Sequence, residues 1–258
     1  MQVVSVIPRS YCRGVVLAIR KALQVRDEHP NEAVTLLGLL VHNQMVVDAL
    51  KRRGIHTVAH PGLSREELLD LVPQGFVIFS AHGVSDAVMA KADRLGLKAV
   101  DATCPEVRFT QDLVREQLEA GREVFYVGKA GHPEALSICD GREGVRMITG
   151  TGDVPSADML PLNKEIFVTN QTTLSMTDLA EVFAVIRERF PRARFSDEIC
   201  SATRRRQEAV RNHDNVDVLL VVGDPLSNNT AMLARIGEEA GIPAVYRVES
   251  AQDLDLAW

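Results

Sequence analysis

Short runs of β-branched and aromatic residues alternate along the chain with longer segments in which apolar positions follow a helical period. The short runs predict strands at 3–7, 34–40, 76–79, 99–100, 124–127, 166–168, 218–222 and 244–248. The periodic segments predict helices at 15–25, 45–51, 107–118, 179–190 and 231–240, and Ser64-x-x-Glu67 and Ser175-x-x-Asp178 have the spacing of capping boxes at helix starts. Apolar strands that alternate with helices are typical of parallel sheets covered on both faces, so the sequence predicts an α/β fold.

Polar and chemically reactive side chains follow most of the predicted strands, where the next helix begins. They are Cys12, His42, His82, Cys104, His132, Glu134, Thr172, Cys200, Ser227, Asn228 and Asn229. In open α/β sheets, ligands bind at the carboxyl ends of the strands, and the helix N-termini there offer free N–H groups that favour anions. The pattern predicts one central site, shared by about three small parallel-sheet units that repeat weakly along the chain.

The cysteines and histidines of this set occupy matching positions. A lone cysteine at a strand end is most often a small buried residue, and a lone histidine can be a structural cap. Three thiols between strand and helix favour a metal centre instead, and three histidines favour a polar cavity. Cys139 follows the apolar run 135–138 without a turn, so we expect it to be a packing residue. Glu134, two residues after His132, suits proton delivery or simply satisfies a helix dipole.

Three thiolates from distant segments restrict the kind of metal centre. No C-x-x-C pair occurs, which excludes a zinc ribbon or a ferredoxin-type loop, and no fourth cysteine is placed to close a zinc site. A [4Fe–4S] cluster held by three cysteines leaves one iron open as a Lewis acid for a substrate oxygen. Neutral His, Thr, Ser and Asn donors around it would suit a phosphate or diphosphate ester.

Composition and charge narrow the function classes. The 258-residue chain has 29 Lys and Arg against 35 Asp and Glu, a formal charge of -6, which disfavours non-specific nucleic-acid binding. Its apolar runs fall short of the ~18 residues that a membrane-spanning helix needs. The N-terminus lacks the basic and apolar regions of a signal peptide. We therefore expect a cytoplasmic enzyme with reduced thiols.

The motifs along the chain resemble those of the 4-hydroxy-3-methylbut-2-enyl diphosphate reductase family, the last enzyme of the methylerythritol phosphate route to isoprenoids. They are RSYCRGV at 9–15, VHN at 41–43, SAHGVS at 80–85, DATCP at 101–105, GHPE at 131–134, QTTLS at 171–175, ICSAT at 199–203 and RQEAV at 206–210. Each motif is modest, but their common order along the whole chain is specific.

The resemblance implies a cloverleaf of three α/β units around a central iron–sulfur cluster, with units at 15–103, at 104–199 and at 1–14 together with 200–258. It implies one [4Fe–4S] cluster per chain, held by Cys12, Cys104 and Cys200. It assigns Glu134 as the proton donor and Thr172 as the contact to the substrate hydroxyl. The residues that it places on the diphosphate are His42, His82, His132, Ser227, Asn228 and Asn229.

The implied reaction is a reductive removal of the allylic hydroxyl that gives isopentenyl diphosphate and dimethylallyl diphosphate. Electrons would come from an external donor such as ferredoxin or flavodoxin, since the chain has no Rossmann or flavin fingerprint. Two alternatives remain at this stage. One is a zinc hydrolase that uses the His and Glu groups, and the other is a non-catalytic iron–sulfur or diphosphate-binding relic.

The sequence departs from the family pattern at three places. Ser10 stands where the family usually has Gly, and Asn228 stands where it usually has a second Ser. Family members continue beyond the position of Trp258 with another strand and a Gly-Ala-Ser motif at the diphosphate. We therefore expect the third unit to be incomplete, the least stable of the three, and the chain to turn over slowly.

Overall fold

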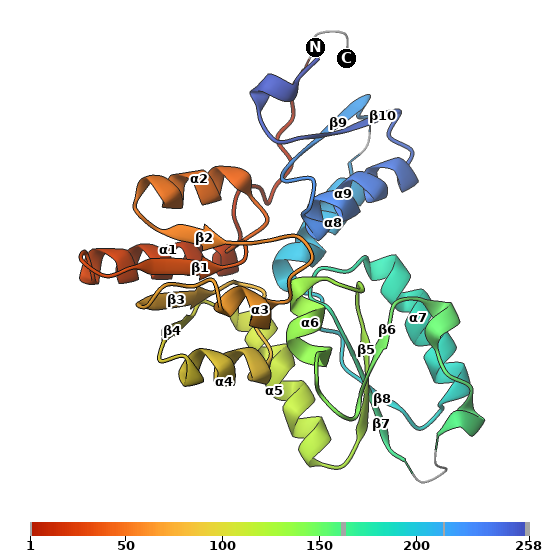
Figure 1. Cartoon of the computed structure of the whole chain (residues 1–258). Coiled ribbons are helices and arrows are strands. Elements are labelled where there is room, and N and C mark those ends of the chain that lie inside the picture. Colours follow the sequence, from red (N-terminus) through yellow and green to blue (C-terminus); the bar gives the residue numbers. More distant parts are fainter. Residues whose placement is uncertain (1, 161–163, 214, 256–258) are drawn as a thin grey trace.

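Three parallel sheets, each built from a separate stretch of the chain, organise the fold (Figure 1). The structure is a computed structural model that describes residues 2–160, 164–213 and 215–255. The sheets have the strand orders β2-β1-β3-β4, β6-β5-β7-β8 and β10-β9, and all the strand pairs of the described residues are parallel. The predicted α/β class is confirmed.

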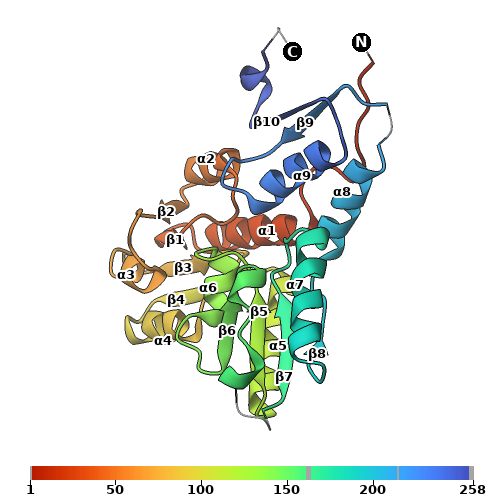
Figure 2. The same ribbon diagram turned by 90° about the vertical axis from the view of Figure 1, so that its right-hand side faces the viewer.

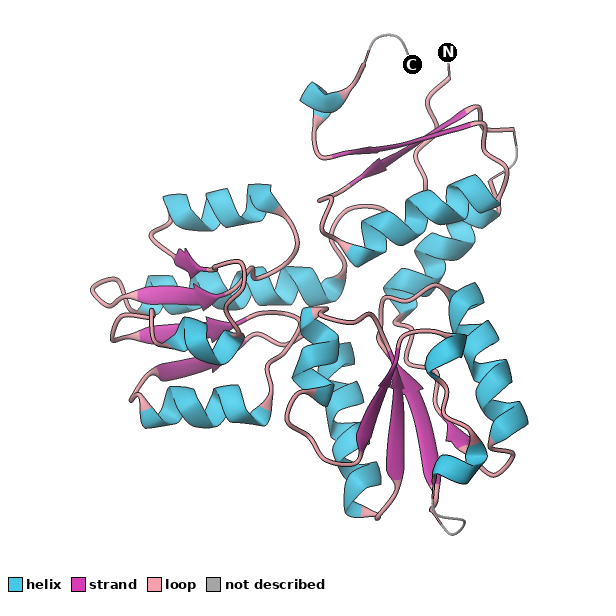
Figure 3. Cartoon of the chain, turned by 45° about the vertical axis from the view of Figure 1, so that its right-hand side comes forward, coloured by secondary structure: helices cyan, strands magenta, loops and turns pink. Residues whose placement is uncertain are grey.

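The first unit contains β1 (Val34–Leu37), β2 (His56–Val58), β3 (Phe76–Phe79) and β4 (Lys98–Asp101), with helices α1 (Arg13–Glu28), α2 (Gln44–Arg52), α3 (Arg65–Leu69) and α4 (Asp86–Arg94). All four residues of β1 are buried, because helices cover both faces of its sheet (Figure 3). The capping box predicted at Ser64 and Glu67 is confirmed, and it starts α3. The polar loops after β1 and β3 carry His42 and His82.

The second unit contains β5 (Glu123–Val127), β6 (Val145–Ile148), β7 (Ile166–Asn170) and β8 (Arg194–Phe195). Its helices are α5 (Pro105–Glu119), α6 (Pro133–Cys139) and α7 (Met176–Arg189), with the 3-10 turns η1 (Thr151–Asp153) and η2 (Ala157–Met159). Every residue of β7 is buried, as expected for a central strand. The box predicted at Ser175 forms only in part: its hydroxyl accepts the Asp178 N–H, while the Asp178 carboxylate pairs with Arg235.

The third unit contains β9 (Val218–Val222), β10 (Ala244–Val248), α8 (Ser201–Arg211), α9 (Asn228–Glu239) and the 3-10 turn η3 (Ala251–Asp253). Figures 1 and 2 show α8 and α9 between this sheet and the rest of the molecule. Burial alternates along β9, where Leu219 and Val221 are buried while Val222 is 71% exposed. The prediction that both faces of the sheet are covered is therefore wrong for this unit.

The strand predicted at 3–7 is also wrong. Residues 2–6 have no regular structure, and the side chains of Val3 and Ile7 are 81% and 76% exposed. β-branched residues favour a strand only where a neighbouring edge supplies hydrogen bonds and packing. The described strands β9 and β10 pair with each other, and the 3–7 segment pairs with neither.

No helix among the described residues is long and apolar enough to cross a membrane. The three units meet near the middle of Figure 1, where α1, α5 and α8 begin. That meeting place positions the candidate site.

Candidate active site

Three of the four cysteines stand at equivalent positions, one N-terminal to each of three helices. Cys12 is the N-cap of α1, Cys104 the N-cap of α5 and Cys200 the N-cap of α8. An N-cap side chain lies beside free backbone N–H groups and the positive end of the helix dipole, which favour a thiolate over a thiol. Cys139 instead ends α6 and packs against the apolar cluster around Val114 and Tyr126, as expected of a packing residue.

The N-cap thiols share one environment. A Cβ on Gly14 would lie 2.4 Å from the Cys104 Sγ and 3.9 Å from the Cys12 Sγ, so only glycine lets α1 approach Cys104 this closely. Burial raises the pKa of Cys104 to about 11, and the charges of Cys12 and Cys200 add to the rise. Burial also raises the pKa of Cys200. At Cys104 and Cys200, burial therefore outweighs the backbone N–H groups of the helix starts, and these two thiols keep their protons at neutral pH unless a metal displaces them.

The spacing of the thiols bears on what they could hold. In the described part of the chain, the one group of three or more His, Cys, Asp and Glu donors within 4.8 Å of one another is formed by the three histidines, not by the cysteines. Sulfurs on a single tetrahedral zinc ion lie about 3.8 Å apart. The three cysteine sulfurs therefore do not all lie at the spacing of ligands to one zinc ion in this structure.

The loops after β1, β3 and β5 bring His42, His82 and His132 together. Their ring centroids lie 4.6 Å apart for His42 and His82, 5.8 Å for His42 and His132, and 5.5 Å for His82 and His132. Burial lowers the pKa of all three, to about 4 for His132. The cluster is therefore neutral at pH 7.

Hydrogen bonds assign the proton of one of these rings. The backbone N–H of Glu134 donates to the Nδ1 atom of His132 over 3.2 Å. A neutral imidazole whose Nδ1 accepts carries its proton on Nε2. His132 therefore offers an N–H donor, whereas both ring nitrogens of His42 are buried without a partner.

Charged groups that the sequence interpretation did not single out surround the histidines. Burial is the largest cause of the lowered pKa values. The guanidinium of Arg65 also lowers the pKa of all three rings, and the ammonium of Lys129 lowers that of His42 and His132. The carboxylate of Asp224 acts on His42 in the opposite direction. The first residue of a five-residue helix gives no pattern that would have marked Arg65.

Glu134 is buried beside Thr172. Its side chain is 1% exposed. The Thr172 backbone N–H donates to Oε1 over 2.7 Å, and the Thr172 hydroxyl lies 2.9 Å from Oε2. Burial raises the pKa of Glu134 to about 7, against these two bonds, which lower it. The acid is therefore partly protonated at neutral pH.

Tyr126, on β5, is a further neighbour that looked like an ordinary core residue in the sequence. It is fully buried, and its hydroxyl has no partner at hydrogen-bond geometry. The Tyr126 side chain nevertheless lowers the pKa of Glu134, although by less than the two Thr172 bonds do. In turn, burial and then the charge of Glu134 raise the pKa of Tyr126 well above its usual value. Because the geometry falls short of a bond, we treat this as an electrostatic contact.

The start of α9 faces the same region. The Ser227 hydroxyl accepts the Thr230 N–H over 3.3 Å and so caps α9. The Asn228 amide donates to the Thr173 carbonyl over 2.8 Å, which ties α9 to the loop that carries Thr172. The Oδ1 atom of Asn229 is buried and has no partner. The side chains of Ser227 and Asn228 therefore make hydrogen bonds that stabilise the fold, whereas the Oδ1 atom of Asn229 has no such bond.

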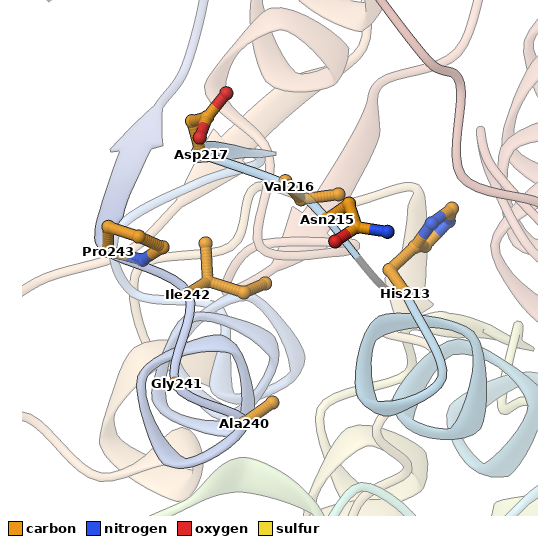
Figure 4. Close-up of a pocket in the computed structure, with 8 residues that line it drawn as sticks. All are labelled: His213, Asn215, Val216, Asp217, Ala240, Gly241, Ile242 and Pro243. Carbon is orange, nitrogen blue, oxygen red and sulfur yellow. The ribbon is translucent and has the colours of Figure 1, made fainter.

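A surface hollow of about 560 Å³ lies elsewhere in the third unit (Figure 4). Its lining includes His213, Asn215, Asp217 and Pro243, and none of the predicted site residues. These residues precede β9 and β10, at the amino ends of the strands. Ligands of open α/β sheets bind at the carboxyl ends, so the cysteine and histidine centre is the stronger candidate.

Comparisons with known proteins agree with the motifs. A profile of the family described as LytB protein matches residues 3–258. The curated 4-hydroxy-3-methylbut-2-enyl diphosphate reductases of Listeria monocytogenes serotype 4b and Anoxybacillus flavithermus are 43% and 41% identical to this chain. The alignments cover 100% of the chain and 78% and 82% of these relatives.

Solved structures agree as well. The E-1-hydroxy-2-methyl-but-2-enyl-4-diphosphate reductase of Plasmodium falciparum matches with a TM-score of 0.87 and 28% identity over 97% of this chain and 77% of that one. A structure of (E)-4-hydroxy-3-methyl-but-2-enyl diphosphate reductase matches with a TM-score of 0.68 and 26% identity over 98% and 87%. The predicted family is confirmed: the chain belongs to the LytB family of reductases.

Proposed function

We propose that this chain reduces (E)-4-hydroxy-3-methylbut-2-enyl diphosphate to isopentenyl diphosphate and dimethylallyl diphosphate. Within the family match, one observation carries the proposal: a buried Glu134 with a pKa of about 7, bonded to Thr172 and within electrostatic reach of Cys200. A protonatable acid close to thiols that would hold a metal is what the removal of a hydroxyl as water requires.

The N-cap cysteines Cys12, Cys104 and Cys200 would hold a [4Fe–4S] cluster, one per chain. Their spacing, the close approach that Gly14 permits and the N–H donors at the helix starts support this assignment. When bound, the cluster supplies electrons and a Lewis-acidic iron for the substrate oxygen. We also propose that the units divide at 15–103, at 104–199 and at 1–14 with 200–258, since each sheet lies within one of these ranges.

The diphosphate would bind at the histidine cluster and the start of α9. The residues proposed to hold it are His42, His82, His132, Ser227, Asn228 and Asn229. Neutral imidazoles beside two cations suit a multiply charged anion, and the side-chain NH2 group of Asn229 would donate to it.

The close approach of the histidines also favours a second candidate, a zinc site of a hydrolase. The proton on Nε2 of His132 opposes it, because a zinc-bound nitrogen must be unprotonated. An N–H donor instead suits the binding of an anion such as a diphosphate. The histidine cluster therefore supports the reductase proposal over a zinc hydrolase.

Glu134 and Thr172 would deliver the proton to the leaving oxygen. Protonated Glu134 can donate from Oε2 to the Thr172 hydroxyl oxygen, 2.9 Å away, and the Thr172 proton is then free to face the substrate hydroxyl. Two electrons and two protons are consumed: one proton leaves with the hydroxyl as water, and the other is added to an allyl carbon. The electrons would come from an external ferredoxin or flavodoxin.

The test is to purify the full chain without air, measure its iron and assay turnover with a reduced electron donor. We expect brown protein with about four irons per chain and formation of both isomeric products. A colourless zinc protein would overturn the reductase proposal, and a brown protein without turnover would favour the non-catalytic relic.

A further inference from the structure

Arg65 is a half-buried cation without a carboxylate partner at the edge of the histidine cluster. It follows the Ser64 cap at the start of α3. Its guanidinium donates from Nη1 to the Gly83 carbonyl and from Nη2 to the Ser80 hydroxyl oxygen, both over 3.1 Å. It forms no ion pair with any carboxylate that the structure describes. Burial lowers its pKa to about 10, so it remains charged at neutral pH.

The Ser80 hydroxyl connects Arg65 to the histidine cluster. Its oxygen accepts from Arg65 and lies 3.4 Å from the Nδ1 atom of His82. If Ser80 donates its proton to that Nδ1 atom, a neutral His82 carries its own proton on Nε2. His82 and His132 then have the same polarity, and both offer an N–H donor rather than a lone pair.

The charges around the cluster are mainly positive. Arg65 acts on all three histidines and Lys129 acts on His42 and His132, whereas the carboxylate of Asp224 acts on His42 alone. A desolvated cation without an anionic partner is unfavourable, and a bound anion removes that cost. A guanidinium is also well suited to phosphate oxygens.

From this geometry we infer that Arg65 is a diphosphate-binding and positioning residue. Its charge attracts the diphosphate group, and through Ser80 it holds His82 as an Nε2–H donor. The inference rests on the proposed function for the identity of the natural ligand. The pocket chemistry itself is tested with inorganic pyrophosphate.

The main test measures pyrophosphate binding to the anaerobically purified full chain by calorimetry. Arg65→Met removes the charge and both hydrogen bonds, and we expect binding to weaken roughly 10- to 100-fold, the usual scale for a charged hydrogen-bond partner. Arg94→Met is the matched control, because Arg94 is exposed at the end of α4 in the same unit. Equal affinity in Arg65→Met and Arg94→Met would overturn the inference.

Further readouts separate binding from a merely structural role. Arg65→Gln keeps an amide donor for Gly83 and serves if Arg65→Met does not fold; it should show the same loss of affinity. Arg65→Lys should recover much of the affinity and its salt dependence, because the charge is restored. In nitrogen-15 NMR, Ser80→Ala should make the His82 ring a mixture of tautomers. An unchanged His82 tautomer would refute the role of the Ser80 link.

Turnover measured in parallel distinguishes this inference from the proposed function. If the unaltered chain reduces its substrate but Arg65→Met binds pyrophosphate normally, only the role of Arg65 is wrong. If the chain binds pyrophosphate through Arg65 but forms no reduced product, only the reductase proposal fails. Absence of pyrophosphate binding by the unaltered chain would refute the anion site as a whole.

Discussion

Replacing Glu134 with Gln separates proton delivery from the rest of the site. Glu134 is buried, and its Oε1 atom accepts the Thr172 N–H over 2.7 Å. Gln has the same shape and keeps that acceptor, so we expect the variant to fold and to bind pyrophosphate like the unaltered chain. It has no acidic proton, and its turnover should fall by ~100-fold or more, the scale of general acid catalysis.

The raised pKa of Glu134 determines how many molecules carry the acidic proton at neutral pH. Burial raises it from 4.5 to about 7. At pH 7 about half of the molecules then carry the proton, against about one in 300 for an ordinary carboxyl group. The shift corresponds to about 3 kcal/mol between the two protonation states. Because the folded-state pKa of Glu134 is raised, its contribution to the free energy of unfolding is fully present below the unfolded-state pKa. That contribution is lost as the pH rises through about 7.

The assay is the pH profile of kcat/KM for the unaltered chain, Glu134→Gln and Glu119→Gln. Glu119 is exposed at the end of α5 and serves as the control. In the unaltered chain and the control, kcat/KM should fall as the pH rises through the pKa near 7, because the acid form is lost. In Glu134→Gln that decline should disappear along with most of the activity. Near-normal turnover, or the same decline in the variant, would refute the role of Glu134.

Three other changes test neighbouring parts of the argument. Replacing any one of the three N-cap cysteines with Ser should abolish iron retention, measured by iron analysis, while Cys139→Ser should keep the iron; the reverse result would refute the ligand set. Tyr126→Phe removes a hydroxyl that lowers the pKa of Glu134, so the decline in kcat/KM should move to higher pH, and a shift to lower pH would contradict that contact. Ser10 has a φ of 68°, so Ser10→Gly should stabilise the fold by about 1 kcal/mol in thermal unfolding; a lower midpoint would show that Ser10 makes a compensating contact.

The sequence predicted the elements whose apolar residues form long or dense runs. The predicted strand 76–79 has the same bounds as β3, and 218–222 the same as β9. The edge strands β2, β6 and β8 were missed, because strands of two to four partly exposed residues carry no recognisable period. The predicted strand 3–7 failed for the opposite reason, since a suitable composition found no neighbouring edge.

The rule that ligands bind at the carboxyl ends of parallel strands predicted part of the candidate site. That rule singled out the histidines, Glu134 and Thr172, and the structure brings these groups together. It could not single out Arg65 or Tyr126. Arg65 reaches the cluster only because Ser80 and Gly83 receive its guanidinium, and Tyr126 matters only because its buried hydroxyl faces an acid from the next helix. Such contacts depend on tertiary packing, which no local pattern encodes.

The groups proposed to bind ligands also make the contacts that join the three units. Gly14 packs on Cys104, and the Asn228 amide bonds to Thr173, in each case between residues of different units. Occupancy of the site and packing of the units are therefore parts of the same equilibrium, because a ligand that binds only the assembled arrangement stabilises it by mass action. A substitution at a cysteine N-cap should then weaken both metal retention and the association of the units. A change such as Glu134→Gln, which lies within the second unit, should affect the chemistry alone.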